Sequence, residues 1–153
     1  MPKPFKLYVS SLSNTTKVIL IESGQLCLAV PANRVREVLI KADVQQQTDH
    51  SFTTYGDLQV PTILGNRPSP SLREVPVALL YAEVLKSGLL AIACNQLPGL
   101  AAVHSEEWQN ASLLPAIWQS EPKGYVKNGK TYIYTTGING TTASTTSQAQ
   151  GVA

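Results

Sequence analysis

Charged residues are scarce in this sequence. Lys, Arg, Asp and Glu make up 14% of the 153 residues, whereas they make up about a quarter of a typical globular domain. The net charge is only +2, and the Lys and Arg residues are scattered and form no basic run. Because proteins that bind nucleic acid usually concentrate positive charge on one face, we expect no nucleic-acid partner.

Residues that commonly perform chemistry are also few. The sequence has two histidines, His50 and His104, and two cysteines, Cys27 and Cys94, with no cluster at metal-ligand spacing. A nucleophile built from a cysteine and His104 would need an exposed thiolate, but both cysteines lie in apolar stretches, which raise the pKa of a thiol. No motif of a hydrolase, a phosphate-binding loop or a calcium site is present. We therefore expect free buried thiols, with a disulfide as the alternative, and no cofactor, no metal and no enzymatic activity.

Long hydrophobic runs are absent as well. No window approaches the 18 or so apolar residues of a membrane-spanning helix, and the N-terminal stretch lacks the apolar centre of a signal peptide. We therefore expect no membrane insertion and a cytoplasmic location. Residues 1–16 are predicted to be a loose leader, and residues 139–153, which hold almost no apolar bulk, a disordered tail. The folded domain is predicted to span residues 17–138.

The sequence does contain a series of short apolar or alternating segments separated by turn residues. Such segments predict β-strands, here at residues 17–22, 25–30, 34–40, 58–64, 75–84, 88–93, 100–103, 125–127 and 130–134. Pro61 has no N–H for a ladder hydrogen bond, so we expect its strand to lie at an edge or a bulge. The polar stretch 41–55 and residues 65–70 are predicted to be loops. About seven to nine short strands indicate an all-β barrel or sandwich.

Three local signals add detail. Asn128-Gly129 stands between two strand segments and predicts a two-residue type I′ hairpin turn, because both residues tolerate positive φ. Residues 105–107 (Ser-Glu-Glu) predict one short helical turn, since a serine cap followed by acids suits a helix N-terminus. Trp108 and Trp118 either close one end of a barrel or anchor an interface with a partner.

The order of these pieces resembles that of the CheW-like domain of bacterial chemotaxis signalling. The opening VILIESGQLCLAVPANRVREVL is similar to the family's strand pair followed by a V-x-E-[IV] motif. The matching residues are Gly24, Val35, Glu37 and Val38. The resemblance extends over about residues 17–138, and its strength lies in the order and spacing of motifs that are individually weak.

Later segments continue the resemblance. Residues 59–63 (QVPTI) are similar to the family's [IV]-P-[IV] strand. Gly88 and Gly99 match the start of a glycine-leucine strand and the glycine that follows it, and residues 123–133 (KGYVKNGKTYI) match the final hairpin. Where the family usually carries an arginine before its proline strand, this sequence has residues 54–57 (TYGD).

The resemblance implies a fold and a role. The fold would be two small SH3-like β-barrels with few short helical turns. The role would be that of a non-catalytic adaptor in chemotaxis-type or motility signalling, with a CheA-like histidine kinase and the tip of a methyl-accepting chemoreceptor as partners. The residues expected at partner surfaces are Val35, Glu37, Val38, Asp57, Pro61, Gly88 and Gly99.

Two alternatives stay open at this point. Glu37, the strongest candidate, is either a partner-binding residue or an ordinary solvated carboxylate on a strand, and in both cases we expect it to be exposed. The main rival function is a small-ligand-binding β-barrel. That function requires an open apolar cavity, whereas side chains should fill the barrels of an adaptor.

Overall fold

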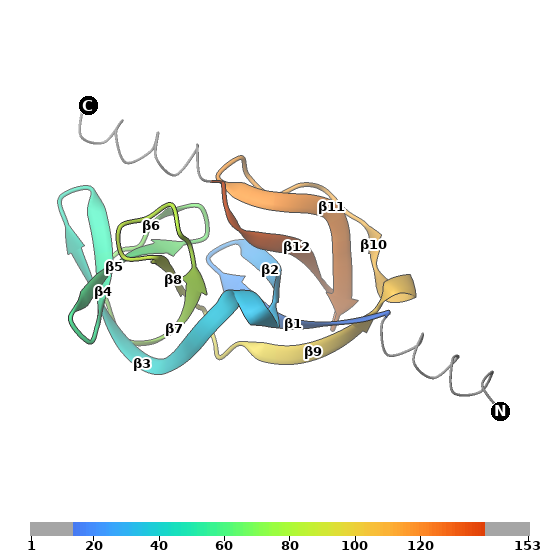
Figure 1. The fold of residues 1–153 in the computed structure, drawn as a ribbon, viewed down its shortest axis with the longest axis horizontal. Helices are drawn as coiled ribbons and strands as arrows, with labels where there is room; N and C mark the ends of the chain where they lie inside the picture. Colours follow the sequence, from blue (N-terminus) through green and yellow to red (C-terminus); the bar gives the residue numbers. More distant parts are fainter. Residues whose placement is uncertain (1–13, 140–153) are drawn as a thin grey trace.

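The computed structural model describes residues 14–139, which fold almost entirely into β-strands (Figure 1). The first six strands are β1 (Thr15–Ser23), β2 (Leu26–Pro31), β3 (Val35–Gln47), β4 (His50–Tyr55), β5 (Leu58–Leu64) and β6 (Arg67–Pro68). The other six are β7 (Leu72–Tyr81), β8 (Leu89–Ala93), β9 (Gly99–His104), β10 (Gln109–Asn110), β11 (Trp118–Lys127) and β12 (Lys130–Ile138). Two three-residue 3₁₀ helices, η1 (Ala32–Arg34) and η2 (Ser105–Glu107), are also present.

The strands form two curved sheets that lie next to each other (Figure 1). In the first barrel the strand order is β10-β11-β12-β2-β1-β9, and η2 joins its edge strands β9 and β10. In the second barrel the order is β4-β3-β7-β8-β5-β6, and pairing of β4 with β5 closes the sheet on itself. The chain thus enters the first barrel, builds the whole of the second, and returns to complete the first. The predicted all-β fold with two barrel-like halves is confirmed.

Three groups of buried apolar side chains hold this arrangement together. One fills the second barrel around Val77 and Leu79, and another fills the first barrel around Val18 and Val103. The third is shared, because it combines first-barrel residues such as Ile21 with second-barrel residues such as Leu80, Ile92 and Cys94. Trp118 also belongs to this shared core and is 4% exposed. Since burial of apolar area is the main stabilising term in folding, the shared core joins the two barrels firmly.

The polar stretch 41–55 is not the predicted loop. Strand β3 continues through Gln47, and β4 occupies most of the remainder. Ala42 and Val44 are buried while their neighbours are exposed, which is the alternation of a half-buried strand. On β4, Thr53 is buried and its hydroxyl lies 2.7 Å from that of Thr62, so hydrogen bonding compensates for its polarity. The prediction failed because polar residues stand at inward-facing positions of this hairpin.

Pro61 does not lie at a sheet edge or a bulge, so that prediction is also wrong. Strand β5 stands between β8 and β6, and its register with β4 is regular. The two-residue turn makes Tyr55 and Leu58 a hydrogen-bonded pair, and alternation then makes Phe52 and Pro61 a pair without hydrogen bonds. The ladder to β8 begins only at Thr62. The proline therefore stands where the ladders to β4 and β8 need no N–H from it.

The local turn predictions fare better. Asn128 and Gly129 have φ angles of 53° and 78° and join Lys127 to Lys130, as a type I′ turn requires. The predicted helical turn is η2, although its N-cap is His104, whose N–H donates to Glu107 Oε1 at 2.8 Å. The predicted loop 65–70 contains the short strand β6.

Several predictions concern the chain ends and the membrane. Apart from residues 14–16 and 139, the predicted leader and tail lie outside the described residues. Strand β1 begins at Thr15. Among the described residues, no helix combines the length and the apolar character that crossing a bilayer requires.

Candidate partner-binding surface

Glu37 lies exposed near the start of β3 in the second barrel, and its carboxylate is held in place. The hydroxyl of Tyr55 donates a hydrogen bond to Glu37 Oε1 at 2.6 Å. The ring of Tyr55 packs against the buried residues of the second barrel. A charged group that is both solvated and positioned loses little rotamer freedom when a partner binds, which favours recognition.

Arg36 lies beside Glu37 and contacts a second tyrosine. Its Nη1 is 3.4 Å from the hydroxyl of Tyr81, and hydrogen bonds with Tyr81 and then Tyr55 raise the pKa of Arg36. The pairing of β3 with β7 is irregular between Val35 and Glu37. Such an irregularity re-aims side chains, so both neighbours reach tyrosine hydroxyls instead of pointing to opposite faces. We call Arg36, Glu37, Tyr55 and Tyr81 the β3 surface.

A groove of about 450 Å³ adjoins the β3 surface, lined partly by Leu39, Thr54, Tyr55 and Gly56. It forms because β7 pairs along most of β3, whereas β4 pairs only from Val44 onward. The hairpin turn after β4 therefore separates from the first half of β3. Ile40, in that same half of β3, is 64% exposed. Charge, two tyrosine hydroxyls and one exposed apolar side chain thus occur on and beside this half of β3.

The structure places four of the seven predicted site residues at or beside this surface. Val35 and Val38 are half-buried on β3, and Val35 packs against the shared core. Glu37 is exposed, as expected. Asp57 is exposed in the two-residue turn that follows Tyr55.

The other three predicted residues lie elsewhere. Pro61 lines a pocket of about 110 Å³ between the barrels, together with Leu85, Ile117 and others. Gly88 closes the turn before β8, with a φ of 72° that favours glycine. Gly99 begins β9 and lines a separate polar pocket of about 220 Å³. The seven residues therefore do not form one site.

A buried serine joins the two barrels beyond the apolar core. The hydroxyl of Ser23 donates to the carbonyl oxygen of Ala93 at 2.6 Å and accepts from the N–H of Gly65 at 2.8 Å. Ser23 has no solvent exposure. Gly65 has a φ of 67°, and a Cβ added to it would lie 3.3 Å from the carbonyl oxygen of Ser23, which is a tight contact. One side chain of the first barrel thus satisfies two backbone groups of the second.

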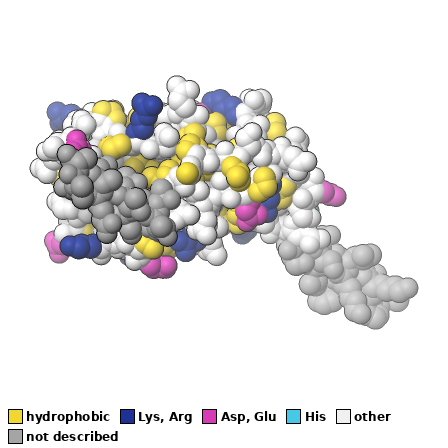
Figure 2. All heavy atoms as spheres, turned by 90° about the horizontal axis from the view of Figure 1, so that it is seen from above, with side chains coloured by type: hydrophobic (Ala, Val, Ile, Leu, Met, Phe, Trp, Pro, Cys, Tyr) yellow, Lys and Arg dark blue, Asp and Glu magenta, His cyan; other side chains and the backbone are white. Residues whose placement is uncertain are grey.

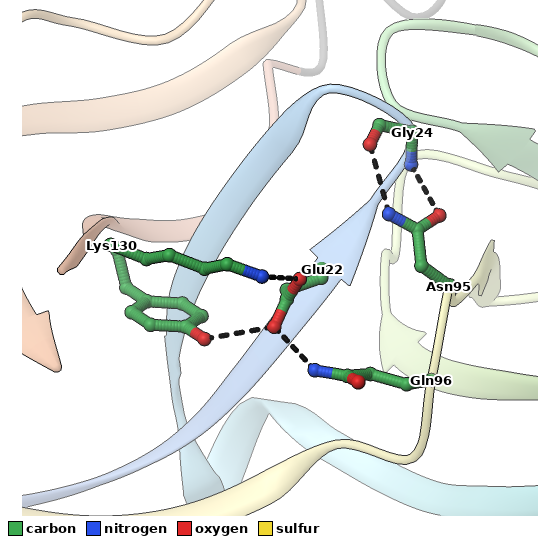
Figure 3. A network of polar contacts seen from close by, with 6 residues as sticks. Glu22, Gly24, Asn95, Gln96 and Lys130 are labelled. Carbon is green, nitrogen blue, oxygen red and sulfur yellow. Dashed lines mark hydrogen bonds and ion pairs between the residues drawn. The ribbon is translucent and has the colours of Figure 1, made fainter. Parts of the chain in front are cut away.

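Figure 3 shows a polar network next to this junction. Asn95 forms two hydrogen bonds with the backbone of Gly24, through Oδ1 at 3.0 Å and Nδ2 at 2.9 Å. Glu22 accepts from Lys130 Nζ at 2.6 Å, from Gln96 Nε2 at 2.5 Å and from the Tyr132 hydroxyl at 3.0 Å. The bond from Lys130 is the main cause of the lowered pKa of Glu22.

Arg34, the last residue of η1, also spans the junction. It follows β2, whereas Ser23 lies at the end of β1. Its guanidinium donates to the carbonyl oxygen of Tyr81 in the second barrel at 2.8 Å and to that of Thr136 in the first at 3.2 Å. The planar guanidinium carries several donors in a fixed arrangement and is suited to bridging two backbones. The shared core, Ser23 and Arg34 therefore fix the two barrels relative to each other.

The cysteines, the potential metal ligands and the surface charges are further candidate sources of chemistry or binding. Both cysteines are free thiols, and burial raises the pKa of Cys94 to about 12 and also raises that of Cys27. Within residues 14–139, no three His, Cys, Asp or Glu side chains converge on a position that could hold a metal ion. On the face shown in Figure 2, Lys and Arg side chains are separated by uncharged atoms. This face therefore carries single positive charges and no broad basic patch that a partner could recognise.

Sequence reasoning did not identify Tyr55, Tyr81, Ser23 or Arg34. Each acts through a partner that is distant along the chain, with a separation of 18 residues for Tyr55 and Glu37 and 70 for Ser23 and Ala93. The sequence offered one usable signal, a tyrosine directly before the Gly56-Asp57 pair, which favours a turn.

The two-barrel arrangement can be compared with known proteins. Neither the models of protein families nor the curated proteins yielded a match to the sequence. Among solved structures, the chain is similar to the scaffolding protein TtCheW from Thermoanaerobacter tengcongensis, with a TM-score of 0.54 and 7% identity over 78% of this chain and 88% of that one. A likeness at this identity concerns the backbone alone, and it shows that the chain has a CheW-like fold of two β-barrels.

Proposed function

We propose that this protein is a non-catalytic adaptor that couples a chemoreceptor to a CheA-like histidine kinase in chemotaxis-type or motility signalling. The observation that carries the proposal is the two-barrel fold shared with a scaffolding protein along nearly the full length of that protein. The sequence motifs around Gly24, Glu37 and Gly88 support the same role independently of the backbone comparison.

An adaptor of this kind must hold two partners at one fixed geometry. The two barrels offer separate surfaces, and the shared core prevents them from moving independently. The hydrogen bonds of Ser23 and Arg34 add directional restraints across the same junction. Rigidity at the junction transmits the orientation of one partner to the other, which is the mechanical requirement for coupling.

We assign the kinase contact to the β3 surface. Glu37 and Arg36 present opposite charges side by side, so a partner with the complementary arrangement is oriented as well as attracted. The exposed Ile40 supplies apolar area that can be buried on binding, and the adjacent groove adds polar side chains such as Lys41 and Asp43. Asp57 borders this area within residues 54–57, the stretch where the family usually carries an arginine, so the charge that faces the partner differs from the family's.

The rival function, a small-ligand-binding barrel, is less well supported. Val60, Val77 and Leu79 in the second barrel and Val18 and Val103 in the first have no solvent exposure and fill the interiors. The apolar pocket between the barrels measures about 110 Å³, whereas pockets for drug-sized ligands measure about 300–1,000 Å³. Side chains therefore fill the barrel interiors, and the larger groove beside the β3 surface is lined partly by polar side chains such as Lys41, Asp43 and Gln45.

The assignment is tested by titration calorimetry, in which this protein is titrated against the regulatory domain of a CheA-like kinase from the same organism. Glu37→Lys should bind at least tenfold more weakly than wild type, because the reversed charge meets a surface complementary to the original one. Tyr55→Phe should bind only a few-fold more weakly, because Glu37 keeps its charge but loses its positioning bond. Glu106→Lys, which reverses an exposed carboxylate of η2 in the other barrel, is the matched control.

Thermal melts accompany each titration. Glu37 is exposed, so its reversal should change the free energy of unfolding by no more than about 0.5 kcal/mol. Wild-type affinity in Glu37→Lys would show that the β3 surface is not the kinase contact. If Glu106→Lys weakens binding as much as Glu37→Lys does, the effect comes from net charge and the assignment fails as well.

A further inference from the structure

A lysine side chain lies between two aromatic rings on the first barrel, whereas the β3 surface belongs to the second barrel. The ammonium of Lys123 is 4.5 Å from the ring centre of Tyr134 and 4.9 Å from that of Trp108. The two rings are nearly perpendicular, with an interplanar angle of 88° and centres 5.4 Å apart. The faces of aromatic rings attract cations, so this corner is a cation-binding geometry that the protein fills with its own side chain.

The aromatic walls are held firmly by the barrel. Trp108 and Tyr125 both pack against the buried cluster that includes Val103 and Tyr132, and their rings meet edge to face with centres 6.5 Å apart. Burial raises the pKa of Tyr134, which reflects its partly enclosed position. The register that pairs Gly124 with Ile133 places Lys123 next to Tyr134 on the neighbouring strand.

The occupant, by contrast, is held weakly. The side chain of Lys123 is 37% exposed, and its carboxylate partner, Glu121, is 3.7 Å away and 56% exposed. Exposed ion pairs of this length contribute little to stability. A primary ammonium is also strongly hydrated, so water readily accepts it when it leaves the rings. Firm walls with a loosely held occupant describe a preformed site that a better-suited cation can enter.

We propose that Trp108 and Tyr134 form a binding site for a small organic cation of the quaternary ammonium class, which Lys123 occupies when no ligand is bound. A quaternary ammonium has no N–H groups to desolvate, and its methyl groups pack against ring faces. It therefore gains more from two perpendicular rings than a lysine ammonium does. The site lies in the first barrel and does not depend on the adaptor function assigned to the second.

Nuclear magnetic resonance of the full chain provides the test, with choline chloride as the probe. The indole N–H resonance that disappears in Trp108→Phe belongs to Trp108. The one that remains belongs to Trp118. Choline should shift the Trp108 resonance and leave that of Trp118, which is 4% exposed in the shared core, in place. The neutral carbon isostere of choline, 3,3-dimethylbutan-1-ol, should cause no comparable shift, and sodium chloride at equal ionic strength controls for salt.

Two lysine variants separate this site from general surface binding. Lys123→Met keeps a long stem but removes the competing ammonium, so choline should bind it about two- to fivefold more tightly than wild type. Lys127→Met, on the same strand, should bind choline as wild type does. Trp108→Leu should abolish binding. Lys123→Gln replaces Lys123→Met if thermal melting shows that the methionine variant does not fold.

Two results would overturn the proposal. Equal shifts from choline and its neutral isostere would show that the rings form an apolar surface without selectivity for cations. Unchanged or weaker choline binding in the Lys123 variants would show that Lys123 does not compete for the site.

Discussion

Replacing Ser23 by alanine removes one of the polar links between the barrels without changing the apolar core. The hydroxyl of Ser23 is the acceptor for the buried N–H of Gly65 and a donor to the buried carbonyl of Ala93. Losing a partner costs about 1–3 kcal/mol for each buried group left unsatisfied. Because an alanine methyl leaves little room for water, we expect Ser23→Ala to lose about 2–4 kcal/mol of unfolding free energy. For a domain of this size, that corresponds to a fall of about 4–16 °C in Tm.

Urea unfolding gives the measurement, followed both by far-ultraviolet circular dichroism and by tryptophan fluorescence. In the wild type both probes should report one transition, because the shared core couples the barrels. Ser112→Ala, at an exposed position, is the matched control and should stay within about 0.5 kcal/mol of wild type. If Ser23→Ala is equally harmless, the hydrogen bonds of Ser23 do not hold the junction, and the apolar core and Arg34 join the barrels without them.

Three further substitutions test individual elements. Gly129→Val should lower the unfolding free energy by about 1 kcal/mol or more, since a β-branched residue resists the φ of 78° found there; an unchanged thermal melt would contradict the turn. Gly124→Ala should cost about 1–3 kcal/mol, because its Cβ would lie 2.7 Å from Thr131 Cγ2, and a neutral result in urea would mean that β11 and β12 separate easily. The pKa of Glu22 lies below its ordinary 4.5, above all through the bond from Lys130, so ionised Glu22 stabilises the fold at neutral pH and loses this effect as pH falls through the lowered pKa. The stability advantage of wild type over Glu22→Gln should therefore shrink below about pH 4.5 in urea titrations, and a difference independent of pH would contradict the ion pair.

Much of the fold could be predicted from the sequence because most strands carry their own signal. The β-branched runs at residues 17–22 and 75–84 and the Asn128-Gly129 turn express local preferences that the tertiary structure keeps. Residues 41–55 show the limit of this reasoning. Their inward positions are held by Thr53 and by short apolar residues, and the hydrogen bond between Thr53 and Thr62 depends on a pairing that local sequence does not specify.

The candidate site was only partly predictable for the same reason. We expected Glu37 to be exposed because few of its sequence neighbours could satisfy a buried carboxylate. Its positioning did not, because Tyr55 reaches it only after β3 curves around the barrel to meet β4. The dispersal of Pro61, Gly88 and Gly99 to other regions shows that residues of separate sequence motifs need not lie at a shared surface.

The central claim, that this protein joins a receptor to a kinase, is tested most directly by co-sedimentation of three purified components. Receptor signalling fragments assembled on vesicles are mixed with the CheA-like kinase, with or without this protein, and pelleted. The account predicts that the kinase pellets with the receptor only when this protein is present, and that Glu37→Lys reduces the pelleted kinase while still pelleting with the receptor. Kinase that pellets equally with and without this protein would contradict the adaptor role.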